Sequence, residues 1–302
     1  MNILLSGGTG LVGKALVPVL QSQGHQVANL TTREELDGVW ENGLRHSYWN
    51  PARMQIKAHE LEWANGVINL AGYSVANRWT NENKNRMIAS RIDSTELLVS
   101  TIMKSPKPPK WFLSAGAIGY YRPSDEWQDE TAKSGSGFLA ELCDNWEDVS
   151  RRLDDFGVRR MIVRIGVVLD PHEGALKQML PLFRSGIGAP VGSGKQWMSW
   201  IHLYDLVQAI AHLANHEEAK GIYNAVAPSP VTNKAFSDAL SHALGKRNIL
   251  PPVPAFMLKL MFGEMASMVL ASQRIRSEKL QSTGFRFAYP EINQALMNLL
   301  RS

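Results

Sequence analysis

Cysteine is nearly absent from this sequence. The single residue of that type, Cys143, cannot form a disulfide bond within the chain. The first residues form an apolar segment with no basic stretch before it, so no secretory leader is expected. Both features favour a protein of the reducing cytoplasm.

An excess of charge of one sign is also missing. The 32 Lys and Arg residues are nearly balanced by 28 Asp and Glu residues, for a net charge of +4, and no basic run stands out. RNA binding through positive charge would need a clustered basic stripe. The sequence therefore predicts no nucleic-acid partner. The eight histidines are scattered, without HxxxH or CxxC spacing, so no metal site is predicted either.

Long hydrophobic runs free of charge are lacking as well. Residues 253–272 are the most apolar stretch near the end, but they include Lys259 and Glu264, each of which would cost several kcal/mol inside a bilayer. We therefore expect a soluble helix and no membrane partner. Four methionines in it share one helical face: Met257, Met261, Met265 and Met268. This spacing indicates a core stripe. The alternative is an adaptable lining for an apolar ligand or a second subunit, which leaves a homo-oligomer open.

What the sequence does contain is a regular alternation of strand-like and helix-like segments. With 302 residues and 44% hydrophobic residues, the chain can bury a sizeable core. Alternating strands and helices predict an α/β fold with a parallel sheet covered on both faces. Strands are expected over residues 2–6, 26–31, 66–70, 111–114 and 160–168. Helices are expected over residues 11–23, 81–103, 137–156, 203–215 and 232–244.

The strongest motif is Gly7-Gly8-Thr9-Gly10-Leu11-Val12-Gly13, which lies between the first strand and the first helix. In a dinucleotide-binding turn of this kind, Gly7 permits a sharp turn and Gly10 lets the backbone approach a pyrophosphate. Gly13 lets the helix pack closely on the sheet, and the helix N-terminus presents N–H donors. The alternative is a glycine turn that binds nothing, but the flanking strand and helix favour a Rossmann site.

The end of the second strand indicates which dinucleotide is bound. NAD sites have an Asp or Glu there to bind the ribose hydroxyl, whereas residues 29–33 read Asn-Leu-Thr-Thr-Arg. The guanidinium of Arg33 can clamp a 2′-phosphate, and Thr32 can add a hydroxyl. The pattern favours NADP(H). The alternative is a surface arginine paired with Glu34 or Glu35.

These motifs resemble the extended short-chain dehydrogenase/reductase, or epimerase/dehydratase, superfamily. The similarity covers nearly the whole chain and includes the Asn-Leu-Ala-Gly stretch at 69–72, the Asp-Glu-Thr stretch at 129–131 and the Trp-Ile-His stretch at 200–202. The segments at 48–51, 164–169 and 273–285 are more narrowly similar to an atypical subfamily labelled "epimerase family protein". Its members carry a C-terminal extension and have no assigned substrate.

The resemblance implies a cofactor site residue by residue. Thr9, Leu11 and Val12 would touch the pyrophosphate, and Thr32 and Arg33 would hold the phosphorylated ribose. Further positions implied are Leu70 and Ala71 beside the adenosine, Arg91 next to Ser90 on the helix that passes the cofactor, and Val168 near the nicotinamide. Alternatives stay open for two of them, because Arg91 can be a surface arginine near Asp93 and Val168 can be plain strand core.

The resemblance also shows a departure in the catalytic residues. Typical members use a Tyr-x-x-x-Lys pair, in which the lysine lowers the tyrosine pKa for proton exchange during hydride transfer. Aligning Glu147 with the family's glutamate places Leu139 at the tyrosine and Cys143 at the lysine. The customary Ser or Thr falls on Gly116 or Ala117.

Other groups are candidates to replace the missing pair. Tyr120 or Tyr121 can supply a phenol, and His202 can act as acid or base near neutral pH. Each also has a structural alternative, since loop tyrosines often pack and the Trp-Ile-His segment can join two lobes. Trp197 and Trp200 can stack on a ligand ring or pack in the core.

The sequence thus predicts a Rossmann α/β fold with a doubly wound parallel sheet and a smaller C-terminal substrate lobe. Residues 1–168 would form the NADP-binding domain and residues 169–302 the substrate lobe, with about 201–225 returning to the first domain. The expected function is an NADP(H)-dependent oxidoreductase or epimerase-like activity on a small, unidentified substrate. The alternative is an NADP(H)-binding or sensing protein without catalysis.

Overall fold

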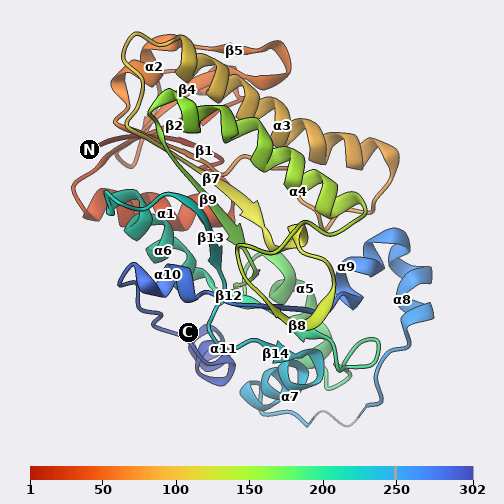
Figure 1. Ribbon diagram of the computed structural model, residues 1–302. Coiled ribbons are helices and arrows are strands. Elements are labelled where there is room, and N and C mark those ends of the chain that lie inside the picture. Colours follow the sequence, from red (N-terminus) through yellow and green to blue (C-terminus); the bar gives the residue numbers. More distant parts are fainter. Residues whose placement is uncertain (248–249, 302) are drawn as a thin grey trace.

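The computed structural model describes residues 1–247 and 250–301, and its centre is a nine-stranded, mostly parallel sheet (Figure 1). The path through the sheet is β13-β9-β7-β6-β1-β2-β4-β3, with β5 paired to β4. The strands are β1 (Asn2–Ser6), β2 (Gln26–Thr31), β3 (Trp40–Glu41), β4 (Leu44–Asn50), β5 (Gln55–Ile56), β6 (Gly66–Asn69), β7 (Trp111–Ala117), β9 (Arg159–Ile165) and β13 (Gly221–Ala225). The predicted Rossmann α/β fold is confirmed.

Helices cover both faces of this sheet, as Figure 1 shows. On one face, α1 (Leu11–Ser22) and α6 (Leu203–Asn215) pack over β1 and its neighbours. The other face carries α2 (Ala58–Trp63), α3 (Asn81–Lys104) and α4 (Phe138–Val149). Helix α3 begins after Thr80, whose hydroxyl accepts the N–H of Asn83 (3.2 Å), and it ends two residues before Pro106.

The remaining helices and short paired strands form the lower part of the molecule in Figure 1. The helices are α5 (Gly174–Arg184), α7 (Asn233–Ala243), α8 (Ala255–Phe262), α9 (Ala266–Leu270), α10 (Glu278–Ser282) and α11 (Ile292–Arg301). The strand pairs are β10 (Val167–Leu169) with β12 (Trp200–His202), β11 (Trp197–Met198) with β14 (Val231–Thr232), and β15 (Gln273–Ile275) with β8 (Ser124–Gln128). A separate hydrophobic core includes Phe183, Trp200 and Phe236. The domain boundary at 168/169 remains a prediction.

Several boundaries differ from those expected from sequence. The strand expected over 160–168 ends at Ile165, because the chain turns at Gly166, where a Cβ atom would lie 2.8 Å from the Ser199 carbonyl oxygen. The helix expected over 137–156 ends at Val149 and continues as 3-10 turns through Phe156. Strand β4 was not predicted, since its Arg-His-Ser-Tyr-Trp sequence shows no clear apolar alternation.

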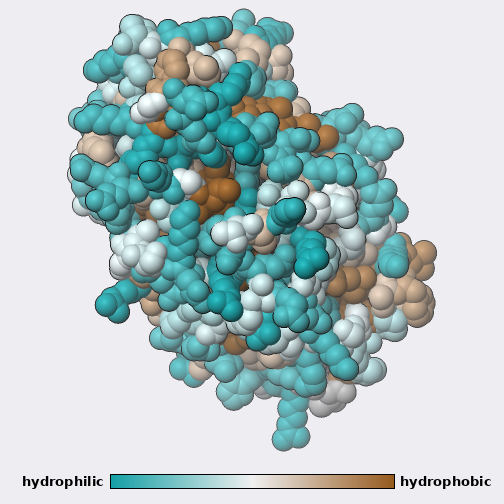
Figure 2. Space-filling view, in the orientation of Figure 1, coloured by the Kyte–Doolittle hydropathy of each residue, from teal (hydrophilic) through white to brown (hydrophobic). Residues whose placement is uncertain are grey.

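The methionine face does not form the predicted core stripe. Gly263, at φ +60°, separates α8 from a 3-10 turn and α9, so residues 253–272 are not one helix. Met265 is buried, but Met257 and Met261 are 42% and 62% exposed. Figure 2 shows the resulting apolar surface at the right edge, where α8 lies. Within residues 1–247 and 250–301, no helix combines the length and apolar character that crossing a membrane requires.

Candidate functional site

The glycine loop joins β1 to α1, and its glycines have different tasks. Gly7 has φ +77°, and a Cβ atom there would lie 2.6 Å from the Leu70 carbonyl carbon. A Cβ at Gly13 would lie 2.3 Å from the carbonyl oxygen of Gly7. By contrast, a Cβ at Gly10 would meet only that same oxygen, at 3.4 Å. The fold itself therefore requires Gly7 and Gly13, whereas Gly10 is left open toward a ligand.

The N-terminus of α1 begins directly after this open position. Gly10 is the N-cap with ordinary extended backbone angles, and no side chain caps the helix. The first helical hydrogen bond runs from Lys14 N–H to the Gly10 carbonyl (2.9 Å). The N–H groups of the first turn, from Leu11 and Val12, are therefore available, and the helix dipole adds positive potential. This arrangement fits a pyrophosphate.

Thr32 and Arg33 lie beside the glycine loop. The β1–β2 register pairs Ser6 with Leu30, so the two strands end side by side, β1 at the glycine loop and β2 at Thr31, one residue before Thr32. Both predicted ribose-phosphate residues are exposed. Across the described part of the chain, the Arg33 guanidinium has no hydrogen bond or ion pair, so the alternative pairing with Glu34 or Glu35 is not seen.

Asn29 supports this corner and was not among the predicted site residues. Its Oδ1 accepts the N–H of Gly8 (3.0 Å), and its Nδ2 lies 3.1 Å from Nδ1 of His46. The side chain thereby fixes the glycine loop to the end of β2. The only sequence signal was an amide residue inside an otherwise apolar strand.

The loop after β6 closes a second side of the site. The N–H of Leu70 donates to the Ser6 carbonyl (3.1 Å), which places Leu70 and Ala71 next to the glycine loop. Arg91, on α3, donates to the Tyr73 carbonyl (3.0 Å) and stacks on Trp146, and its burial lowers the pKa of its guanidinium. Arg91 is thus an anchor of this loop rather than a free surface arginine.

Val168 reaches the site from β10. A Cβ at Gly174 would lie 3.9 Å from the Val168 carbonyl oxygen and 3.7 Å from a methyl group of Leu11, so β10 and the start of α1 are close. The Val168 side chain is half-buried and packs against the core of the sheet. Its predicted contact with a nicotinamide stays a prediction, as do the cofactor contacts of the other residues above.

Leu139 and Cys143 face the loop that follows β7. A Cβ atom at Gly119 would lie 3.4 Å from Leu139 Cβ and 3.7 Å from Cys143 Sγ. Helix α4 therefore presents these two side chains to the C-terminal end of a central strand, where ligands of open α/β sheets bind. Burial raises the pKa of Cys143 to about 12, and the nearby carboxylate of Glu147 adds to this shift.

The thiol of Cys143 should consequently be inert in the folded protein. Relative to a thiol of ordinary pKa, the thiolate population at neutral pH falls by about three orders of magnitude. We expect a thiol-disulfide reagent such as dithionitrobenzoate to label less than stoichiometric amounts over hours in buffer and one thiol per chain in denaturant. Labelling within minutes under native conditions would contradict the burial and the pKa.

A buried polar network holds the hydroxyl of Tyr121 in place. Arg164 and Glu147 form a two-pronged ion pair at 2.7 and 2.8 Å. Arg164 also donates to the Tyr121 hydroxyl (2.9 Å), which donates to Asn224 Oδ1 (2.7 Å). Burial raises the Tyr121 pKa to about 12. Tyr121 is therefore fully committed to structure and is poorly suited to proton transfer.

His202 is likewise committed to structure. Its Nδ1 accepts the N–H of Tyr204 (3.0 Å) at the start of α6, which leaves the proton on Nε2, 3.2 Å from Asn298 Oδ1. The ring stacks on Tyr289 at 4.1 Å, and burial lowers the His202 pKa. Since Asn298 lies on α11, the histidine joins α6 to the C-terminal helix.

Tyr120 differs from Tyr121 and His202. Its half-buried ring lies over the Arg164 guanidinium, 3.5 Å from Cζ to the ring centroid. In the residues that the structure describes, its hydroxyl has no hydrogen-bond partner. It is the one candidate phenol that is held in place by its ring while its hydroxyl stays available.

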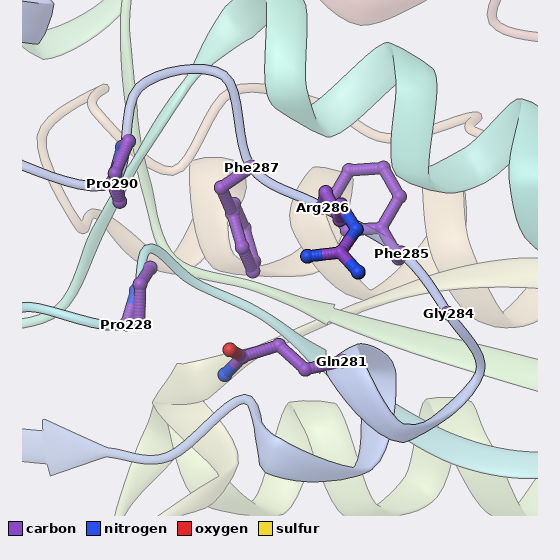
Figure 3. A pocket seen from close by; sticks show the side chains of 7 residues that line it. All are labelled: Pro228, Gln281, Gly284, Phe285, Arg286, Phe287 and Pro290. Carbon is purple, nitrogen blue, oxygen red and sulfur yellow. The ribbon is translucent and has the colours of Figure 1, made fainter.

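A surface hollow of about 440 Å³ lies apart from these predicted site residues. Figure 3 shows the side chains of Gln281, Arg286 and Phe287 projecting into it. Its lining comes from the segment around α10 and from Pro228, and it includes none of the predicted cofactor residues.

Comparison with known proteins shows which family this chain is similar to. The pattern of the NAD dependent epimerase/dehydratase family matches residues 3–225, and that of a domain of unknown function, DUF1731, matches residues 253–299. The human epimerase family protein SDR39U1 is 33% identical over 308 residues, which cover 99% of this chain and 100% of that protein. The epimerase family protein SAR0825 of Staphylococcus aureus is 35% identical over 300 residues, 98% of each chain.

Solved structures agree with this similarity. A crystal structure of human SDR39U1 (isoform 2) with NADPH has a TM-score of 0.88 at 32% identity and covers 100% of both chains. A nucleoside-diphosphate sugar epimerase of Corynebacterium glutamicum has a TM-score of 0.79 at 29% identity, covering 100% of this chain and 59% of that one. From the matched family pattern and the full-length relatives, we conclude that the chain belongs to the NAD dependent epimerase/dehydratase family.

Proposed function

We propose that this protein binds NADP(H) and acts as an oxidoreductase or epimerase-like enzyme on a small polar substrate. The observation that carries the proposal is the guanidinium of Arg33, which is exposed, follows the end of β2 directly after Thr32, and has no partner among the described residues. The NADPH in the crystal structure of the similar human protein supports the same cofactor. No acidic residue stands at the end of β2, where an NAD site would need one.

In this proposal the backbone of α1 and the side chain of Arg33 hold the two phosphate regions of the cofactor. Leu70 and Ala71 flank the adenosine, and Val168 lies beside the nicotinamide. Bound NADP(H) supplies or accepts a hydride. The chain's own task is to orient the cofactor and to give or take the accompanying proton.

Removing the Arg33 guanidinium should affect the binding of NADPH and of NADH differently. Arg33→Ala should weaken NADPH binding by about ten- to a hundredfold, the loss expected for charge-assisted hydrogen bonds, while NADH binding hardly changes. Cofactor fluorescence titrations measure both. Arg301→Ala, which removes an exposed arginine from the last turn of α11, should change neither. Equal affinity of the natural protein for NADH and NADPH would overturn the cofactor assignment.

The proton-transfer group is proposed to differ from that of typical family members. No tyrosine in the sequence is followed by a lysine four positions later. On α4, Leu139 has no ionisable group and burial raises the pKa of Cys143 to about 12, so neither exchanges a proton at neutral pH. Among the candidates, Tyr120 has the available hydroxyl, and its ring is held over the Arg164 guanidinium.

A second candidate function is NADP(H) binding or sensing without catalysis, and the apolar Leu139–Cys143 surface favours it. The two functions differ in a direct measurement, the oxidation of bound NADPH in the presence of a panel of carbonyl compounds. Turnover with any of them supports the enzyme. A metabolite extract that raises the melting temperature of the NADP-saturated protein would identify the substrate class by linkage.

A further inference from the structure

Arg274 stands in the middle of an aromatic cluster outside the predicted cofactor residues. It lies on β15, where its Cα pairs with that of Trp127 on β8. Its Cζ lies 4.3 Å from the Trp127 ring centroid and 4.1 Å from that of Trp197 on β11. The backbone N–H of Trp197 donates to Ser272 (2.9 Å), which ties β11 to the start of β15. We refer to Arg274, Trp127 and Trp197 as the Arg274 cluster.

Among the described residues, no protein acceptor binds the N–H groups of the half-buried Arg274 guanidinium. Its Nε is buried without a hydrogen-bond partner, and over residues 1–247 and 250–301 the group forms neither an ion pair nor a side-chain hydrogen bond. The two indole faces stabilise the cation, but they cannot accept its N–H groups in ordinary hydrogen bonds, because the indole N–H is only a donor. A buried donor or charge without a partner is unfavourable, so this arrangement needs an explanation.

Neighbouring arginines show what a satisfied arginine looks like in this protein. Arg164 has its donors filled by Glu147 and Tyr121, and Arg276, on the other side of Ile275, pairs with Glu278 at 3.2 Å. The acid next to the cluster is Asp125, whose Oδ1 accepts the hydroxyl of Ser272. It forms no ion pair with Arg274 among the described residues.

The position of β15 connects the cluster to the proposed active site. The preceding residue in the strand, Gln273, donates to the Ile118 carbonyl (2.7 Å), at the start of the turn that carries Tyr120. At the end of β15, the N–H of Ile275 donates to the Ser199 hydroxyl (3.0 Å). The carbonyl of Ser199 in turn accepts the N–H of Val167 (3.0 Å). The strand is thus fixed between the Tyr120 turn and β10. Trp127 is 38% exposed, so the cluster borders solvent.

We propose that Arg274 recognises an oxyanion, a carboxylate or phosphate group, on the substrate of this protein. The inference rests on the proposed function and gives its substrate a chemical class. Arginine's planar fork matches two oxygen atoms of such a group. The indole rings that pack against the guanidinium hold it in one orientation and leave its edge for the ligand. The substrate is therefore a small anion whose charged group lies at the Arg274 cluster.

The test uses the full chain saturated with NADPH and labelled with ¹⁵N-tryptophan. Trp127→Phe and Trp197→Phe assign the two indole N–H signals of the cluster. Sodium phosphate and sodium acetate are titrated separately, with sodium chloride keeping the ionic strength constant. We expect saturable shifts of both signals with at least one anion, and the better anion tells phosphate from carboxylate chemistry.

Variants decide whether Arg274 is responsible. Arg274→Gln should lower the affinity for the anion by at least about tenfold. Arg301→Gln, which removes the charge of an exposed arginine in the last turn of α11, should leave anion binding unchanged. Arg274→Lys keeps the charge but loses the fork, so it should bind more weakly than the natural protein, and it serves as the test if Arg274→Gln does not fold. Equal anion affinity in the Arg274 variants, or no saturation with either anion, overturns the inference.

The same samples separate this inference from the proposed function. NADPH fluorescence reports cofactor binding without any turnover. Saturable anion binding by a protein that does not bind NADPH would refute the proposed function and keep the anion site. Normal NADPH binding without anion binding would refute the anion site alone.

Discussion

Replacing Gly10 with valine is expected to abolish NADPH binding while the protein stays folded. The backbone at Gly10 has φ −80° and ψ 172°, which valine adopts easily. A Cβ there meets only the Gly7 carbonyl oxygen, at 3.4 Å. The added methyl groups would extend into the space above the α1 N-terminus, where the pyrophosphate must approach the backbone. We expect NADPH affinity to fall more than about a hundredfold, the loss of a whole set of charge-assisted hydrogen bonds.

Gly13 provides the matched control, because valine there should disrupt the fold itself. Its Cβ would lie 2.3 Å from the Gly7 carbonyl oxygen and 2.6 Å from Gly8 Cα, both backbone atoms. We therefore expect Gly13→Val to unfold or strongly destabilise the protein. Circular dichroism melting and NADPH fluorescence distinguish the two changes. If Gly10→Val binds NADPH normally with an unchanged melting curve, the loop has only a structural role.

The features that the sequence predicted well depend on local signals. The glycine motif, the start of α1 at Leu11 and the bounds of α6 follow from turn chemistry and helical spacing, which involve residues close in the chain. The role of Thr32 and Arg33 in holding the cofactor stays a prediction, which rests on the position of the β2 strand end in this fold. Because turn chemistry and helical spacing are local, the fold class was predictable before any contact was known.

The features that the sequence did not reveal depend on contacts between distant segments. Arg164 reaches Tyr121 across 43 positions, and Arg274 lies among tryptophans from two other strands. Nothing in their local sequence distinguishes a satisfied arginine from an unsatisfied one. The prediction that the four methionines form a core stripe was wrong for a related reason. Periodicity shows that residues share a face, but it does not show whether another element covers that face, and Gly263 ends the helix partway along.

The second large effect concerns catalysis of ordinary family substrates. In the proposed function no phenol stands next to a lysine ammonium, so we expect sugar nucleotides to lack the general acid–base catalysis that this pair supplies, worth about a hundred- to ten-thousandfold. We expect turnover of sugar nucleotides to be lower by this factor than in family members with the Tyr-x-x-x-Lys pair. Single-turnover oxidation of bound NADPH measures the chemical step directly.

Variants of the three candidate groups identify the replacement acid. Tyr120→Phe should reduce turnover without changing NADPH affinity, because it removes only a hydroxyl that has no partner among the described residues. Tyr121→Phe should mainly lower stability, by about 1–3 kcal/mol, since Arg164 and Asn224 lose a buried partner. His202→Ala should also act through stability, because the ring joins α6 to α11.

Restoring the family's pair should not restore activity. In the double variant Leu139→Tyr/Cys143→Lys, the new ammonium would replace a thiol that is almost fully buried and lies within the field of Arg91 and Arg164. Desolvation, the largest influence at this position, and these two cations would favour the neutral amine, against the carboxylate of Glu147, which favours the ammonium. A neutral amine cannot lower the pKa of the adjacent phenol. We expect no gain in sugar-nucleotide turnover and a lower melting temperature. Fast epimerisation by the natural protein, unaffected by Tyr120→Phe, Tyr121→Phe or His202→Ala, would show that the proton-transfer group lies elsewhere and that α4 is misaligned with the family.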